Sequence, residues 1–217
     1  ESICGQIREK LLGNTKTDSW NPKCEIVLHS SSETYQQAVG AGSQQTVGSS
    51  AIQFQAGKIL QRRIDLLLSD GNQPLGALQH ELVHVIFADL FPDKAPPPWA
   101  EEGLALLHDC YEKRDRHRND LREALHNNTV LSLDKLFNAP NYPTGRDRAV
   151  FCSQSLSAVE YLVARGTPEQ FVQFVRFCVE SDPDQALNKA YKIENIKQLE
   201  PLWHRHALMS VAHTAGR

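Results

Sequence analysis

Two histidines and a glutamate stand close together in the sequence His80-Glu81-Leu82-Val83-His84. If this segment is helical, residues four apart differ by about 40° in direction, so His80 and His84 share one face. Imidazole nitrogens are preferred ligands of zinc. Glu81 is turned by about 100° from His80, which places it beside such an ion, as a base for a water molecule. The spacing therefore predicts His80 and His84 as zinc ligands and Glu81 as the general base.

A catalytic zinc ion held by two histidines needs a third protein ligand. The segment 98–105, with the sequence PWAEEGLA, contains two adjacent glutamates, Glu101 and Glu102. A carboxylate oxygen is a suitable third ligand, and each of the two side chains offers one. The residue types alone leave the choice between these glutamates open.

The segments 80–84 and 98–105 together resemble the pattern of the gluzincin metallopeptidases, the thermolysin-like and aminopeptidase-like clan. The chain is most similar to a group of compact bacterial peptidase-like domains within that clan, over roughly residues 24–208. The resemblance implies a zinc-dependent hydrolase that cleaves peptide bonds in a peptide or protein substrate. It also implies that the glutamate directly before glycine, Glu102, is the third zinc ligand. The loop and helix between His84 and Glu102 are 17 residues long, one fewer than is usual in related aminopeptidases.

The chain departs from this resemblance at one position. Relatives often have a tyrosine three residues before the serine that matches Ser155, whereas this chain has Cys152. Because that tyrosine is expected to stabilise the oxyanion, the departure leaves the role without an assigned residue. Asp109 is the candidate acceptor for the N–H group of a ligand histidine. The candidate donors to the carbonyl oxygen are His108, Tyr111, Tyr142 and Tyr161, and for each of them the structural role is the favoured interpretation.

Two other functions compete with the peptidase. Cys152 is compatible with a peptidase-like binding or regulatory module that keeps the metal but has little turnover. A helical interaction domain with accidental histidines is the third hypothesis, and it predicts no stoichiometric zinc. The intact Glu81 favours the enzyme, and the apolar neighbours Val85 and Ile86 argue against a pair of surface histidines.

The elements that position these residues follow from the apolar periodicity. Strands are predicted at 25–29, 51–54 and 63–68, and a helix from Pro74 to about Leu90. Pro98 can open a second helix, which is predicted to run from Trp99 to about Tyr111. Further elements are a loop or twisted edge hairpin at 41–50, a turn at 69–72, an exposed helix and loop at 112–128, and helices at about 2–11, 33–39, 149–163, 167–179 and 182–191, with a last helix ending near 212. Ser31 or Ser32, Thr167 and Asp182 are the predicted caps of three of these helices.

Strands therefore come first and helices follow, which predicts an α+β fold. We expect one metallopeptidase-like domain over residues 1–217. Its N-terminal lobe, residues 1–92, is predicted to hold a small mixed sheet and the zinc helix. Its C-terminal lobe, residues 93–217, is predicted to be helical, with the active-site cleft between the lobes.

Composition excludes several other classes. The chain has 217 residues, 41% of them hydrophobic, and a formal net charge of −3, which is typical of a globular protein. A slightly acidic chain lacks the basic stripe that nucleic-acid binding requires, so no nucleic-acid partner is expected. The longest nearly apolar run, 82–91, is far shorter than the roughly 20 residues of a membrane-spanning helix.

The five cysteines are widely spaced and form no C-x-x-C pair, so neither a thiolate zinc site nor a redox motif is predicted. A bridge between Cys4 and Cys24 is the one pairing considered, and free buried thiols are the alternative. The chain begins at Glu1 rather than at Met, which favours a processed, secreted or cell-envelope protein.

Overall fold

The computed structural model describes residues 2–13, 20–68, 74–145 and 147–214. Within these residues, a three-stranded mixed sheet lies in the N-terminal part and the C-terminal part is helical, which confirms the predicted α+β class. The chain divides into two compact units. The sheet unit comprises residues 1–9 and 14–95, and the helical unit comprises residues 10–13 and 96–217.

The sheet consists of β1 (Cys24–His29), β2 (Gly48–Gln55) and β3 (Lys58–Leu67), with β3 in the centre. β3 pairs in parallel with β1 and antiparallel with β2. Ala56 and Gly57 join β2 to β3, and both have positive φ, 48° and 72°. Positive φ at both central residues is what a tight two-residue hairpin turn requires, because it matches the twist of the strands.

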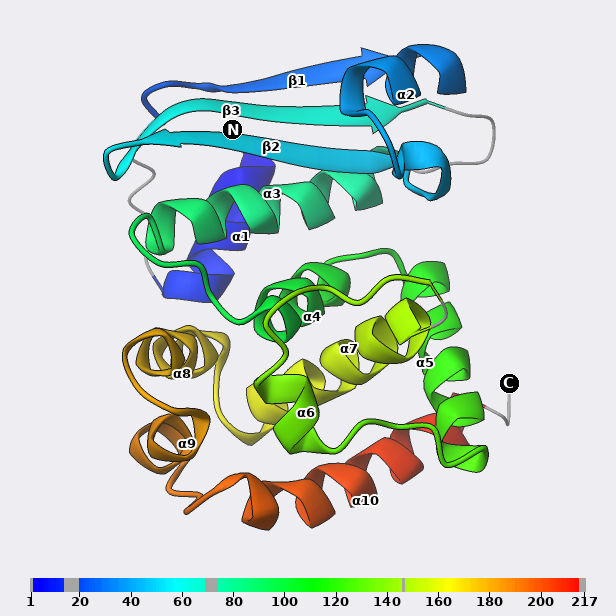
Figure 1. Cartoon of the computed structure of the whole chain (residues 1–217), viewed down its shortest axis with the longest axis vertical. Helices are drawn as coiled ribbons and strands as arrows, with labels where there is room; N and C mark the ends of the chain where they lie inside the picture. The colour runs from blue at the N-terminus through cyan, green and yellow to red at the C-terminus, as the bar shows by residue number, and fades with distance from the viewer. Residues whose placement is uncertain (1, 14–19, 69–73, 146, 215–217) are drawn as a thin grey trace. The chain divides into compact units, whose positions relative to one another are not determined.

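The helix α3 (Pro74–Leu90) covers one face of this sheet (Figure 1). Leu82 and Ile86 on the helix are buried, as are Ile64 and Leu66 on β3. Burial of these apolar surfaces fixes the rotation of α3 about its own axis, and therefore the direction of its polar side chains. The predicted helix from Pro74 to Leu90 is confirmed.

Asp89, near the end of α3, fixes the helix to the sheet by polar contacts. Its carboxylate accepts hydrogen bonds from Arg62 on β3 and from the indole N–H of Trp20. The Arg62 guanidinium also donates to the backbone carbonyl of Pro22 at 2.6 Å, and Arg8 lies 3.6 Å from the Asp89 carboxylate. The end of α3 is therefore held at a defined place on β3.

Three helices begin where the sequence predicts a capping residue. The side chains of Ser31, Thr167 and Asp182 each accept a hydrogen bond from the backbone N–H three residues further along the chain. The helices that follow these caps are α2 (Ser32–Val39), α8 (Pro168–Glu180) and α9 (Pro183–Tyr191).

Several predicted elements are wrong in their bounds. The strand predicted at 63–68 is β3, which begins at Lys58. The segment predicted as a loop or edge hairpin, 41–50, contains a short 3-10 helix, η1 (Ser43–Gln45), and then the first residues of β2. The helix predicted from Trp99 to about Tyr111 ends earlier, as α4 (Pro98–Leu107), and the helix predicted after it is α5 (Tyr111–His126). They separate because Cys110 adopts an extended conformation. The turn predicted at 69–72 lies outside the described residues.

The helical unit is built around an aromatic cluster. Trp99 on α4 is fully buried and stacks on Phe137, with ring centroids 4.0 Å apart. Phe171 and Phe174 on α8 contact the same indole ring. Phe137 belongs to α6 (Leu133–Phe137), a short helix that the sequence does not predict. The cluster anchors the first turn of α4, the helix that carries Glu102.

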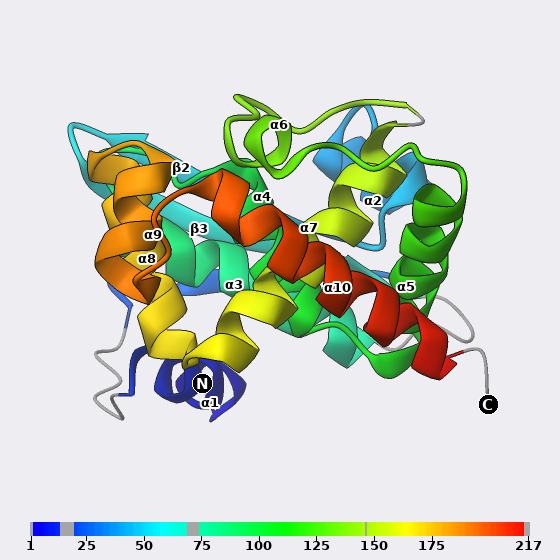
Figure 2. The ribbon, with the colours of Figure 1, turned by 90° about the horizontal axis from the view of Figure 1, so that it is seen from below.

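The other long helices of the helical unit pack on α7. α7 packs along α4, and α5 packs on α7. α10 crosses α7 and reaches α5 (Figure 2). It contains Pro201, so a proline in its second turn does not stop the helix. The bounds of the other helices are Ser2–Leu12 for α1, Asp147–Arg165 for α7 and Ile196–Thr214 for α10.

The described helices include none that is both long and apolar enough to cross a lipid bilayer. All five cysteines are free, so the bridge considered between Cys4 and Cys24 is not formed.

Candidate metal centre

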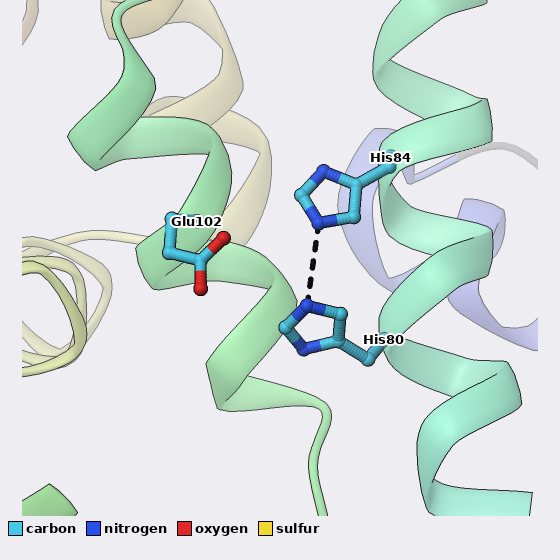
Figure 3. Close-up of side chains that lie close together, drawn as sticks. All are labelled: His80, His84 and Glu102. Carbon is cyan, nitrogen blue, oxygen red and sulfur yellow. Dashed lines mark hydrogen bonds between the residues drawn. The ribbon is translucent and has the colours of Figure 1, made fainter. Parts of the chain in front are cut away.

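α3 brings the two histidines of the motif together on one face. His80 and His84 are both half-buried, one helical turn apart. Their Nε2 atoms are 3.3 Å apart and their ring centroids 5.0 Å apart (Figure 3). Both histidines belong to the sheet unit, so this separation depends only on α3 and its own side chains.

The separation of 3.3 Å matches the spacing of two ligands on one tetrahedral ion. Zinc–nitrogen bonds of about 2.0–2.1 Å, at the tetrahedral angle, place the two ligand atoms about 3.3–3.4 Å apart. A hydrogen bond between the rings also fits this distance, with one Nε2 as the donor and the other as the acceptor. The histidine pair is therefore already in a geometry that an ion could bridge without moving α3.

Glu102 joins the histidines in a group that could hold a metal ion. The nearest ligand atoms of His80, His84 and Glu102 all lie within 4.8 Å of one another (Figure 3). Glu102 comes from α4, where its side chain is buried. The neighbouring Glu101 is half-buried and does not belong to this group. Of the two glutamates left open by the residue types, the structure thus groups Glu102 with the histidines.

Glu102 is held against α7. The Sγ atom of Cys152 on α7 donates a hydrogen bond to Glu102 Oε1 at 3.6 Å, and both side chains are buried. Burial raises the pKa of the Cys152 thiol, and the negative charge of Glu102 raises it further. At neutral pH the sulfur therefore carries its proton and acts as a donor to the carboxylate.

The residue after Glu102 explains how α4 comes so close to α7. A Cβ atom added to Gly103 would lie 2.4 Å from the backbone oxygen of Ser155 and 2.6 Å from Val159 Cγ2. No side chain fits at such a distance, so glycine is required for this approach. Cys152 and Ser155 are three residues apart and share the face of α7 that meets α4.

Glu81 is placed differently, against the sheet. Its side chain is 7% exposed and lies over Gly48, the first residue of β2. A Cβ added to Gly48 would lie 2.9 Å from Glu81 Oε1. Tyr35 lies nearby, with its hydroxyl 2.8 Å from Thr46 Oγ1. Burial raises the pKa of Tyr35, and the charges of Glu81 and Asp65 contribute to that rise.

Tyr142 has the surroundings expected of a donor near the glutamates. Burial raises the pKa of its hydroxyl, and the charges of Glu101 and Glu102 raise it further. Its ring makes an edge contact with Phe151, the residue before Cys152. The phenol therefore remains protonated at neutral pH and keeps a hydrogen to donate.

The other three candidate donors, and the candidate acceptor, have different neighbours. His108 donates its Nδ1 hydrogen to the Leu104 carbonyl at 2.9 Å. Tyr111 is 51% exposed at the start of α5. The Tyr161 ring contacts His206 on α10. Asp109 is buried and forms an ion pair with Lys113 at 3.3 Å.

Sequence reasoning missed the contact of Gly48 with Glu81 and the contact of Cys152 with Glu102. An isolated glycine signals a close approach only inside a strand pattern, and Gly48 fell in the segment predicted as a loop or edge hairpin. The Cys152 contact joins residues 50 positions apart, and nothing local to either residue indicates it.

Comparisons of the chain with protein-family models, with curated proteins and with solved structures find no match.

Proposed function

We propose that this protein is a zinc-dependent peptidase of gluzincin type, with His80, His84 and Glu102 as the zinc ligands and Glu81 as the general base. The observation that carries the proposal is the 3.3 Å separation of the two histidine Nε2 atoms, on a helix that also presents a buried glutamate next to the first histidine. The motif residues and the fold order agree with the resemblance drawn from the sequence.

The donor set fits zinc. Two imidazole nitrogens and one carboxylate oxygen, with a fourth position for water, are the ligands of a catalytic rather than a structural zinc site. A hard cation such as Mg²⁺ or Ca²⁺ would instead prefer oxygen ligands. Zinc bound there would supply a Lewis acid for a peptide carbonyl and would lower the pKa of a water molecule.

Glu81 is the residue that would move the proton. Its carboxylate lies one position after His80 on α3, too far round the helix to align with both histidines. A carboxylate so placed can accept a proton from the attacking water and deliver it to the leaving amine. Packing over Gly48 limits the range of positions open to this carboxylate, while the end of the side chain can still rotate.

The test is a digest of a peptide library by wild-type protein and by Glu81→Gln, with and without a chelator. Gln keeps the shape of the side chain and cannot accept the proton, so hydrolysis should fall about 10²–10⁴-fold while zinc content stays the same. Glu101→Gln is the matched control, since it changes a neighbouring glutamate outside the ligand group, and it should retain both zinc and turnover.

Three results would contradict the proposal. Equal rates for wild type and Glu81→Gln would mean that the hydrolysis comes from another protein. Zinc bound to wild type without turnover of any peptide would instead favour the binding or regulatory module. Absence of stoichiometric zinc in wild type would support the interaction domain with accidental histidines.

A further inference from the structure

We propose that Cys152 is a positioning residue for Glu102, and that its S–H group holds the carboxylate in the orientation that binds the metal. This inference rests on the proposed function, since it assigns a support to one of the proposed ligands. It concerns contacts made wholly within the helical unit, between α4 and α7.

The contact is fixed by the backbones of the two helices. Gly103 sits against the carbonyl oxygen of Ser155 so closely that a Cβ would be only 2.4 Å from it. That approach sets the register of α4 along α7 and leaves little freedom to slide. Glu102 precedes Gly103, and Cys152 lies one turn before Ser155, so the register brings the thiol to the carboxylate.

A carboxylate has two oxygens, and a metal ion needs only one of them. The hydrogen bond from Cys152 goes to Oε1 and therefore restricts the rotation of the carboxylate. Glu102 is 7% exposed and Cys152 is 5% exposed, so water can replace this donor only poorly. Groups that hydrogen-bond to metal ligands fix the ligand orientation, and their loss typically weakens metal binding about 10–100-fold.

The thiol is a poor donor compared with a hydroxyl, which sets the size of the expected effect. A sulfur–oxygen distance of 3.6 Å marks a weak hydrogen bond. We therefore expect the lower end of that range, about tenfold, when the S–H group is removed.

The experiment measures zinc dissociation constants by competition with a chelator for wild type, Cys152→Ala, Cys152→Ser and Cys178→Ala. Cys152→Ala should bind zinc about tenfold more weakly, and Cys152→Ser, which keeps a donor, should bind more tightly than Cys152→Ala. Cys178 lies on α8, so Cys178→Ala controls for removing a thiol from the same unit and should match wild type. If Cys152→Ala does not fold, the zinc dissociation constant of Cys152→Ser is compared with that of wild type instead.

Three results overturn the inference. If Cys152→Ala and Cys152→Ser both bind zinc as tightly as wild type, the thiol does not position Glu102. A thiolate-to-metal charge-transfer band in the cobalt-substituted wild type would show that Cys152 binds the metal itself. If wild type binds no zinc, the proposed function fails and this inference fails with it, whereas the first two results leave the proposed function intact.

Discussion

The two helices that carry the candidate site are packed in different ways. α3 lies on a sheet, and at the site the end of the Glu81 side chain lies against Gly48. α4 lies on another helix, and there Gly103 lies against the backbone of Ser155. The end of a side chain can move by rotation about its own bonds, whereas a helix backbone can move only together with its neighbours.

The difference matches the tasks proposed for the two glutamates. Glu81 must accept a proton and release it, so some freedom at the end of its side chain is useful. Glu102 must hold a metal, and a ligand performs best when its orientation is fixed in advance. We therefore expect the contact at α3 to control turnover and the contact at α4 to control stability.

Gly103→Ala tests the rigid side of this comparison and should have the largest effect on the free energy of unfolding. The added methyl group would meet backbone atoms that cannot rotate away, and overpacking of a core costs about 1–3 kcal/mol or more. We expect a loss of about 3 kcal/mol in chemical denaturation, or a protein that does not fold. A loss below about 1 kcal/mol would show that α4 and α7 can separate easily.

Asp65→Asn tests the polar network that supports the sheet. Asp65 is buried, accepts two hydrogen bonds of 2.8 Å from Arg63, and lies 2.6 Å from His29 Nε2. Hydrogen bonds to charged groups contribute about 1.5–3 kcal/mol, so we expect a loss of about 2 kcal/mol at neutral pH.

The pH dependence of that loss has a defined direction. The hydrogen bonds from Arg63, and then the one from His29, hold the pKa of Asp65 below its ordinary value of 3.8. Asp65 therefore contributes its stability above pH 3.8, and the contribution is lost as pH falls through the lowered pKa. Denaturation curves at several pH values should show wild type and Asp65→Asn converging in acid. Asp93→Asn, at an exposed carboxylate of the same unit, should show no such loss.

Gly48→Ala tests the adaptable side of the comparison and should have the smallest effect on stability. The Glu81 side chain can shift, and replacing glycine within a strand recovers about 0.5–1 kcal/mol, so the net change should stay below about 1 kcal/mol. Because the shift displaces the proposed base, peptide hydrolysis should fall at least tenfold with zinc retained. Ser49→Ala, on the opposite face of β2, should leave the rate unchanged. If Gly48→Ala hydrolyses peptides at the wild-type rate, the contact of Glu81 with Gly48 does not control turnover.

Local signals explain which parts of the fold were predictable. Ser31, Thr167 and Asp182 were recognisable as caps because their side chains bond to backbone within the same turn. The α3 helix was recognisable because Pro74 starts a regular apolar stripe. The end of α4 was predicted at about Tyr111 and lies at Leu107, since apolar and polar residues continue past it without a glycine or proline.

The site was predictable to the extent that its residues lie within short motifs. His80, Glu81 and His84 fall on one helix turn, so helix geometry alone relates them. The choice of Glu102 over Glu101 needed the resemblance, and the grouping with the histidines needed the structure. The contact of Cys152 with Glu102 depends on how α4 packs against α7, which no local pattern encodes.

An anomalous-scattering map at the zinc absorption edge, from crystals grown with stoichiometric zinc, tests the central claim most directly. We predict one peak per chain, about 2.0–2.2 Å from Nε2 of His80, Nε2 of His84 and a carboxylate oxygen of Glu102. A peak away from the two histidines, or a bound ion with Glu102 turned away and Glu101 in its place, would contradict this account.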